Sequence, residues 1–142
     1  MSDVLSVEIQ GKKEFEATLR NLVKALPAEK VEPVMLAGAK VIAQDIRRRA
    51  IGNIKKAVVA KLLKKIGNWP RSAMAAINNR KAPEAHLIEF GTSRRYQKTT
   101  GRYTGIGPAK PFFRPAVDSN FQRVYRDIRD KLLDMVIAAA RK

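Results

Sequence analysis

The pattern of hydrophobic and polar residues changes period several times along this 142-residue chain. Apolar and polar residues alternate over residues 5–10, which is the period of a half-buried strand. Apolar residues then recur at helical spacing from Phe15 to Leu26. Pro27 is expected to end that helix, because its ring cannot continue the hydrogen-bond ladder. The chain is therefore predicted to open with a strand and a helix.

Two further helices are predicted before the middle of the chain. The first begins near Pro33, which is tolerated in a first turn, and runs to about Ala50. The second covers residues 54–66, where an apolar residue recurs every four positions with lysines between. Its lysines are expected to form one face, which is solvated by default and alternatively meets DNA or an acidic neighbouring subunit. This face comprises Lys55, Lys56, Lys61, Lys64 and Lys65.

The second half of the chain predicts two strands and one long helix. The strands are expected at residues 72–79 and 85–90, where they could pair with the first strand. A terminal helix is expected from Pro115, with one apolar stripe running down it. The order βαααββα predicts one α+β domain over residues 1–142. In it, a small antiparallel or mixed sheet packs against helices. The stripe comprises Val117, Phe121, Val124, Ile128, Leu132, Met135 and Ala139.

The segment around the last predicted strand gives three local expectations. Alternation would turn Glu89 away from its two apolar neighbours, leaving it solvated or paired with a nearby arginine. Gly91 is expected to adopt a positive φ where the strand enters a loop. Phe112 and Phe113 are expected to pack under the sheet, and the alternative is that they form a contact surface.

Charge indicates that the protein has an anionic partner. The chain carries 29 Lys and Arg against 13 Asp and Glu, a formal net charge of +16, and self-repulsion on that scale destabilises a compact monomer. DNA, RNA, an acidic protein surface and an anionic membrane would all satisfy this charge. Cysteine is absent, which excludes disulfides and thiolate metal sites. No apolar run has the length of a membrane span and no cleaved signal is evident, so a soluble protein is expected.

The long loop at residues 93–110 has the composition of a contact element. No Asp or Glu occurs between Phe90 and Val117. A long, Gly-rich and basic loop in a compact domain is more often functional or disordered than decorative. Its positive and aromatic residues are Arg94, Arg95, Lys98, Arg102 and Lys110 with Tyr96 and Tyr103, and Arg114 follows the loop.

The residue inventory does not support an enzyme. His86 is the only histidine, which excludes a His-based metal cluster, and it is expected to be a sheet residue. Neither a dinucleotide fingerprint nor a phosphate loop is present. The sparse carboxylates do not suggest an acid–base pair or a two-metal site, and a metal-dependent nuclease is the one enzyme class that they leave open. No catalytic, cofactor-binding or metal-binding residue is therefore assigned, and no cofactor is expected. The carboxylates considered are Asp45, Glu84, Glu89 and Asp118.

Two motifs flank the loop, Glu-Phe-Gly-Thr at residues 89–92 and Pro-Phe-Phe-Arg-Pro-Ala at residues 111–116. Together they resemble the signature of the tail-component, or tail-completion, family of tailed bacteriophages. The basic segment at residues 50–65 also resembles part of the lambda-type minor tail protein that completes tails. These resemblances cover roughly residues 33–120.

The resemblance implies a structural subunit of the virion, assembled in the host cytoplasm. Copies would form a ring, expected to be a hexamer, at the head-proximal end of the tail, with genome DNA passing through it. Its partners would be other copies of itself, the tail tube or tail terminator protein, and head-closure or connector proteins. No membrane partner is implied.

The resemblance also sorts the motif residues into two groups. The loop would be an assembly arm, with subunit or partner contacts at Glu89, Thr92, Arg94, Arg95, Tyr96, Lys98, Arg102 and Tyr103. The residues of the structural motif would be Phe90, Gly91, Pro111, Phe112, Phe113, Arg114 and Pro115. The alternative function is a stand-alone basic nucleic-acid-binding protein, which has the required charge but lacks the helix-turn-helix, zinc-finger and stacking-sheet signatures.

Overall fold

The computed structural model describes residues 17, 20, 26–67 and 70–141. The strand predicted at residues 5–10 lies outside the described residues, as does most of the helix predicted at residues 15–26. The remaining chain has an α+β fold with two small antiparallel sheets. Its elements are α2 (Ala28–Arg49), α3 (Ile54–Ala57), β1 (Val58–Leu62), β2 (Ala73–Ile77), α4 (Ala85–Phe90), β3 (Arg95–Tyr96), β4 (Tyr103–Gly105) and α5 (Phe113–Ala140).

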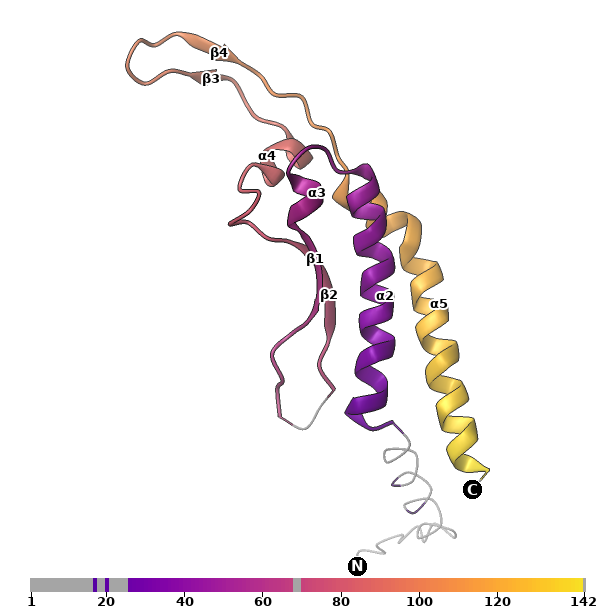
Figure 1. Cartoon of the computed structure of the whole chain (residues 1–142). Helices are drawn as coiled ribbons and strands as arrows, with labels where there is room; N and C mark the ends of the chain where they lie inside the picture. Colours follow the sequence, from indigo (N-terminus) through magenta and orange to yellow (C-terminus); the bar gives the residue numbers. More distant parts are fainter. Residues whose placement is uncertain (1–16, 18–19, 21–25, 68–69, 142) are drawn as a thin grey trace, which may run out of the picture.

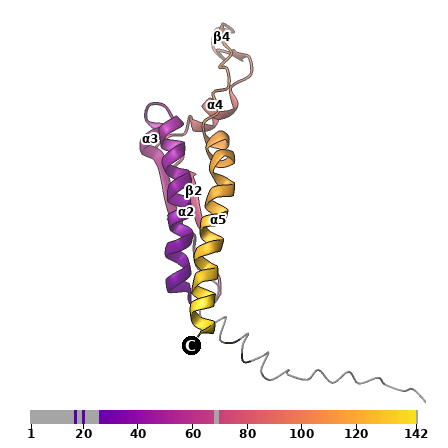
Figure 2. The ribbon, with the colours of Figure 1, turned by 90° about the vertical axis from the view of Figure 1, so that its right-hand side faces the viewer.

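Helix α2 is the centre of the body. It packs against both strands of the β1–β2 sheet and against α5. The two long helices run side by side in both views (Figures 1 and 2). The β3–β4 hairpin extends beyond the body at the end where α3 and α4 lie (Figure 1). We call residues 93–110 the arm.

The two long helices approach each other closely at Gly38. A Cβ atom added at Gly38 would lie 2.7 Å from Cδ1 of Ile128 and 2.8 Å from Cγ1 of Val124. A larger residue would require the side chains of Ile128 and Val124 to shift, so Gly38 allows the two helices to pack closely. The apolar stripe predicted on the last helix is confirmed at Val124, which is buried, whereas Phe121 is 53% exposed.

The hydrophobic core lies at the end of the body from which the arm extends. It is formed where the last turns of α2 meet α3, the start of β1, α4 and the start of α5. Most of its side chains are small. The core comprises Ala43, Ile46, Ala50, Ile54, Ala57, Val58, Ala82, Ala85, Phe112 and Ala116.

The helix predicted over residues 54–66 is wrong beyond Ala57. Residues Val58–Leu62 form β1, which pairs with β2 in an antiparallel register that places Val58 opposite Ile77. The apolar residues recur every four positions, and because four is even they also share one face of a strand. The β-branched Val58 and Val59 favour the strand. The strand predicted at residues 72–79 is confirmed as β2.

The strand predicted at residues 85–90 is also wrong, because these residues form the six-residue helix α4. Ala85 and Glu89 lie one turn apart on its buried side, while Phe90 is 77% exposed. The apolar sequence Leu87-Ile88 is too short for its period to distinguish a strand from a helix. The terminal helix begins at Phe113, two positions before the predicted start.

Candidate assembly interface

Glu89 caps the last helix from another element. Its Oε2 atom accepts the backbone N–H groups of Phe112 at 2.8 Å and Phe113 at 2.9 Å, and its Oε1 atom accepts that of Arg114 at 3.0 Å. These are donors that the start of an α-helix leaves without an intrahelical partner. Helix α5 has neither a side-chain cap of its own nor an acidic residue in its first turn, so Glu89 provides both the cap and the negative charge.

The prediction that Glu89 is either solvated or paired with an arginine side chain is therefore wrong, because its hydrogen-bond partners are backbone N–H groups. The residue is 9% exposed. Burial alone raises the pKa of Glu89, but the hydrogen bonds from Phe112, Phe113 and Arg114 and the charge of Arg114 bring that pKa below its usual value. Glu89 is an ionised structural brace, and its position does not fit the contact role predicted for it.

Gly91 and Thr92 form the root of the arm. Gly91 has φ +74° and ψ −177°, a region that is essentially restricted to glycine, which confirms the expected positive φ. A Cβ atom on Gly91 would lie 2.8 Å from both the Ala109 nitrogen and the Gly107 oxygen. The segment that enters the arm at Gly91 and the segment that returns at residues 107–109 therefore approach each other as closely as glycine permits.

Hydrogen bonds hold the outgoing and returning segments of the arm together at this root. The Thr92 N–H donates to the Gly107 oxygen at 2.8 Å, and Oγ1 of Thr92 accepts the Gly107 N–H at 2.9 Å. The Lys110 N–H donates to the Ile88 oxygen at 2.8 Å, which fixes the returning chain to α4. Thr92 is thus a root residue, and its side chain is occupied within the subunit.

The arm itself is a β-hairpin and not an irregular loop. Tyr96 pairs with Tyr103 across the two strands, and their rings lie 5.4 Å apart at 55°. The Gln97 N–H donates to the Arg102 oxygen at 2.8 Å, which extends the pairing toward the tip. All residues from 93 to 104 are exposed. The predicted contact residues Arg94, Arg95, Tyr96, Lys98, Arg102 and Tyr103 are therefore brought together on one projecting hairpin.

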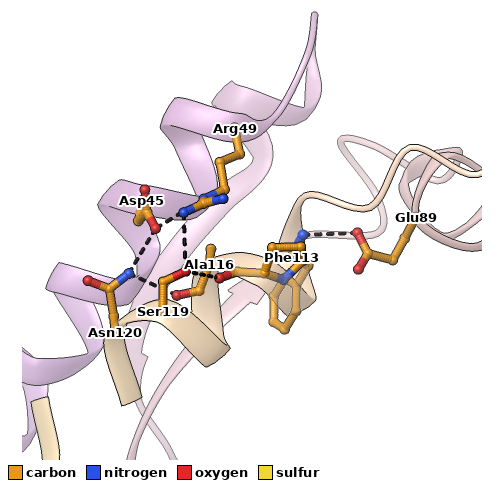
Figure 3. Close-up of polar contacts among 8 residues, drawn as sticks. Asp45, Arg49, Glu89, Phe113, Ala116, Ser119 and Asn120 are labelled. Atoms are coloured by element: carbon orange, nitrogen blue, oxygen red, sulfur yellow. Dashed lines mark hydrogen bonds and ion pairs between the residues drawn. The ribbon is translucent and has the colours of Figure 1, made fainter. Parts of the chain in front are cut away.

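A polar network fixes the first turns of α5 to α2 (Figure 3). Oδ2 of Asp45 accepts hydrogen bonds from Nε of Arg49 at 3.1 Å and from Nδ2 of Asn120 at 2.8 Å. Nη2 of Arg49 also donates to Oγ of Ser119 at 3.3 Å. Glu89 binds the start of α5, and this network binds the next turns of α5 to α2. Together these contacts connect the root of the arm to the two long helices.

The two phenylalanines of the closing motif differ in burial. Phe112 is 3% exposed and belongs to the core, whereas Phe113 is half-buried at its edge. The expectation that they pack inside is confirmed for Phe112. Phe113 instead lines an open groove of about 480 Å³ between the end of β2, α4 and α5. The groove also contacts Ile77, Ala85, His86, Phe90 and Val117.

The predicted lysine face is divided by the strand. Lys55 and Lys56 are exposed on α3, and Lys61 is exposed on β1. Lys64 and Lys65 follow β1, in the connection between β1 and β2. Because β1 replaces the expected helix, these residues do not lie on one face of a single helix.

The acidic residues and His86 do not assemble into a catalytic arrangement in the described residues. Asp45 belongs to the helix–helix network and Asp118 lines the groove. His86 is exposed on α4 and is not the sheet residue that was predicted. Within the described chain, no group of three or more His, Asp or Glu residues could hold a metal ion. None of the helices formed by these residues has the length and apolarity to cross a membrane.

Sequence reasoning missed an ion pair that ties the segment before β2 to α2, between the largely covered Glu32 and the partly exposed Arg71. The Arg71 side chain donates to Oε2 of Glu32 through Nε at 3.0 Å and Nη2 at 2.7 Å, and the Arg71 N–H donates to Oε1 at 3.0 Å. The hydrogen bonds from Arg71 lower the pKa of Glu32 to about 2. The two residues are 39 positions apart, so no local pattern could have indicated this pair.

No protein-family model, no curated protein and no solved structure matches this chain.

Proposed function

We propose that this protein is a structural subunit of a tailed bacteriophage that forms a ring at the head-proximal end of the tail. In this role it completes the tail and joins it to a DNA-filled head, with the genome passing through the ring. The proposal rests on the resemblance of residues 89–92 and 111–116 to the tail-completion family. The arrangement of those residues supports it, because they build the root of a projecting basic hairpin.

The single observation that carries the proposal is the construction of this root. Glu89, Gly91, Thr92 and Phe112 all belong to the two motifs, and each holds the base of the arm or the start of α5. A hairpin fixed at its base loses little conformational freedom when it docks, so more of its contact energy is available for binding. This is the design expected of an arm that fits a partner in one orientation.

Assembly would proceed through non-covalent contacts between subunits, without a catalysed reaction. The Tyr96–Tyr103 pair offers flat amphipathic surface, and the surrounding arginines match the residue types that dominate protein interfaces. The arm would meet the next subunit, or complementary surfaces on tube, terminator, head-closure or connector proteins. Heterologous contacts between identical copies close into rings when the rotation permits.

The second candidate is a stand-alone nucleic-acid-binding protein. The observation in its favour is the net charge of +16 together with an arm that contains no acidic residue. A two-stranded ribbon also has dimensions that the major groove of DNA admits.

Negative-stain imaging of the purified protein, with and without duplex DNA, separates the two candidates. Rings that form without DNA would support the tail subunit. Uniform monomers distributed along DNA, with no rings at any protein concentration, would favour the second candidate.

A further inference from the structure

The outer face of the β1–β2 sheet contains a hollow that the tail-subunit role does not use. It has a volume of about 400 Å³ and lies on the side of the sheet opposite the core. Its lining residues are Val59, Lys61, Ala76, Ile77, Asn78, Asn79 and Arg80.

The register of the sheet explains its shape. Val58 and Ala60 face the core, so alternation turns Val59 and Lys61 outward, and Ala76 pairs with Val59 across the ladder. The short side chain of Ala76 leaves space above the sheet. Lys61 lies on one side of that space, and the turn that follows β2 lies at its end.

The charged side chains that line this hollow are all cations. Lys61 and Arg80 contribute cations. Oδ1 of Asn78 accepts the Arg80 N–H at 3.0 Å, which leaves the amide nitrogen of Asn78 to donate elsewhere. No carboxylate lines the hollow, and neither Lys61 nor Arg80 has an ion pair among the described residues. A site with positive charge and free donors but no acid fits an anion.

Further cations lie at the end of the hollow where the turn meets α3. The Asn78 N–H donates to the Ala57 oxygen at 2.8 Å, which places the turn beside the last residue of α3. Lys55 and Lys56 are exposed on that helix, and Lys81 is exposed on the turn. The positive charge thus continues beyond the hollow, as a ligand with several regularly spaced anionic groups requires.

We propose that this hollow binds phosphodiester groups of duplex DNA, with Lys61 and Arg80 contacting the phosphates and Asn78 donating a hydrogen bond. Contacts of this kind carry no base specificity and release condensed counterions. The site concerns the single subunit, so it stands or falls independently of whether copies form a ring. It is also separate from the arm, which remains available for protein partners.

The test compares two double variants of equal net charge. Lys61→Ser/Arg80→Ser removes both cations of the hollow. Lys64→Ser/Lys65→Ser removes two exposed cations from the same basic segment, outside the hollow. DNA affinity is measured by fluorescence anisotropy over a range of salt concentrations, with circular dichroism to establish that each variant is folded.

We expect the hollow variant to lose several-fold more affinity than the control. Its plot of log affinity against log salt should be shallower by up to about 0.9 per phosphate contact removed. Equal losses in both variants would mean that only net charge matters, and would overturn the proposal. Unchanged affinity in the hollow variant would overturn it as well.

A second variant tests the site without removing a cation. Asn78→Asp keeps the oxygen that accepts the Arg80 N–H but replaces the free donor by a carboxylate oxygen. We expect it to weaken DNA binding, with a larger effect than Gln44→Glu, which adds an acid at an exposed position of α2. An equal effect of both substitutions would contradict a phosphate contact in the hollow.

A comparison with inorganic phosphate tests the alternative that the hollow binds small anions and not DNA. NMR signals of Asn78 and Arg80 should shift saturably with duplex DNA and much less with inorganic phosphate at the same phosphate concentration. Equal saturation by phosphate alone would indicate a small-anion site and overturn the assignment to DNA.

Discussion

The carboxylate of Glu89 lies 2.8 Å from the backbone nitrogen of Phe112, although the two residues are 23 positions apart. Between them lie Phe90 at the end of α4, the root, the arm and Pro111. The segments before and after the arm are therefore joined by the Glu89 side chain, in addition to the hydrogen bonds of the root, and that side chain also caps α5. Loss of this contact should loosen the start of α5 and the foot of the arm together.

Glu89→Gln should destabilise the protein by about 1–3 kcal/mol. The amide keeps one accepting oxygen but turns an NH₂ group toward backbone donors, and the negative charge at the helix N-terminus is lost. Urea denaturation measures the change. Glu84→Gln, on the same short segment but only half-buried, should change stability by less than about 0.5 kcal/mol. Equal stability of the two variants would refute the capping role.

Stability should fall as the pH is lowered from about 4.5 toward about 2. The folded-state pKa of Glu32 is about 2, below its usual value, because the carboxylate binds Arg71. A carboxyl with a lowered folded pKa stabilises the fold above its unfolded pKa, and this contribution is lost as pH falls toward the folded pKa. The pKa of Glu89 is also lowered, so it acts in the same direction.

Glu32→Gln should reduce the stability at neutral pH and flatten the profile in this window. Thermal denaturation at a series of pH values measures both effects. Glu29→Gln, which removes an exposed carboxylate from the same helix, is the control and should retain the slope of the original protein. A Glu32→Gln profile as steep as that of the original protein would show that this ion pair does not govern the acid transition.

Phe112→Ala should destabilise the fold by about 3–5 kcal/mol, because it removes a buried ring and leaves a cavity. Phe113→Ala should cost less, since that ring is half-buried beside an open groove. Phe121→Ala is a matched control on the same helix, at a position that is 53% exposed. If Phe113→Ala proved the more damaging of the pair, the assignment of Phe112 to the core would be wrong.

The sequence predicted the fold class, most of α2, β2 and the long terminal helix, and the two helices were found through their apolar period. It placed the start of α2 near Pro33, whereas that helix begins at Ala28 and Pro33 lies inside it. It failed at β1 and α4 for physical reasons. A spacing of four is compatible with both a strand and a helix, and the short apolar sequence of α4 fits either. Tertiary contacts decided both cases.

The candidate site was likewise predicted in part from the sequence and missed in part. The composition of residues 93–110 predicted an exposed basic element, and the positive φ of Gly91 followed from its position before the loop. The cap formed by Glu89 and the hydrogen bonds of Thr92 to Gly107 could not be predicted. They join side chains to backbone groups 15 and 23 positions away in the sequence, and only the folded chain brings these groups together.

In the assembled particle, we expect several copies of the protein in a closed ring at the neck or tail, six by the family resemblance. Closed rings are the usual result of heterologous contacts between identical subunits. Reconstruction of the particle counts the copies directly. A single copy at that position, or no copy in the neck or tail, would refute the ring.

Head–tail joining in vitro, measured beside DNA affinity on the same variant, tests the central claim most directly. The variant replaces four arm cations by serine, and exposed charges of this kind contribute little to stability. These cations are Arg94, Arg95, Lys98 and Arg102. A control of equal charge replaces exposed lysines outside the arm, at Lys30, Lys40, Lys64 and Lys131.

If the arm is an assembly element, tails that contain the arm variant should fail to join heads, while tails with the control should join normally. The salt dependence of DNA binding should then change by a similar amount in both. Normal joining by the arm variant, together with a collapse of its DNA affinity that the control does not share, would contradict a tail-subunit role and favour a stand-alone nucleic-acid-binding protein.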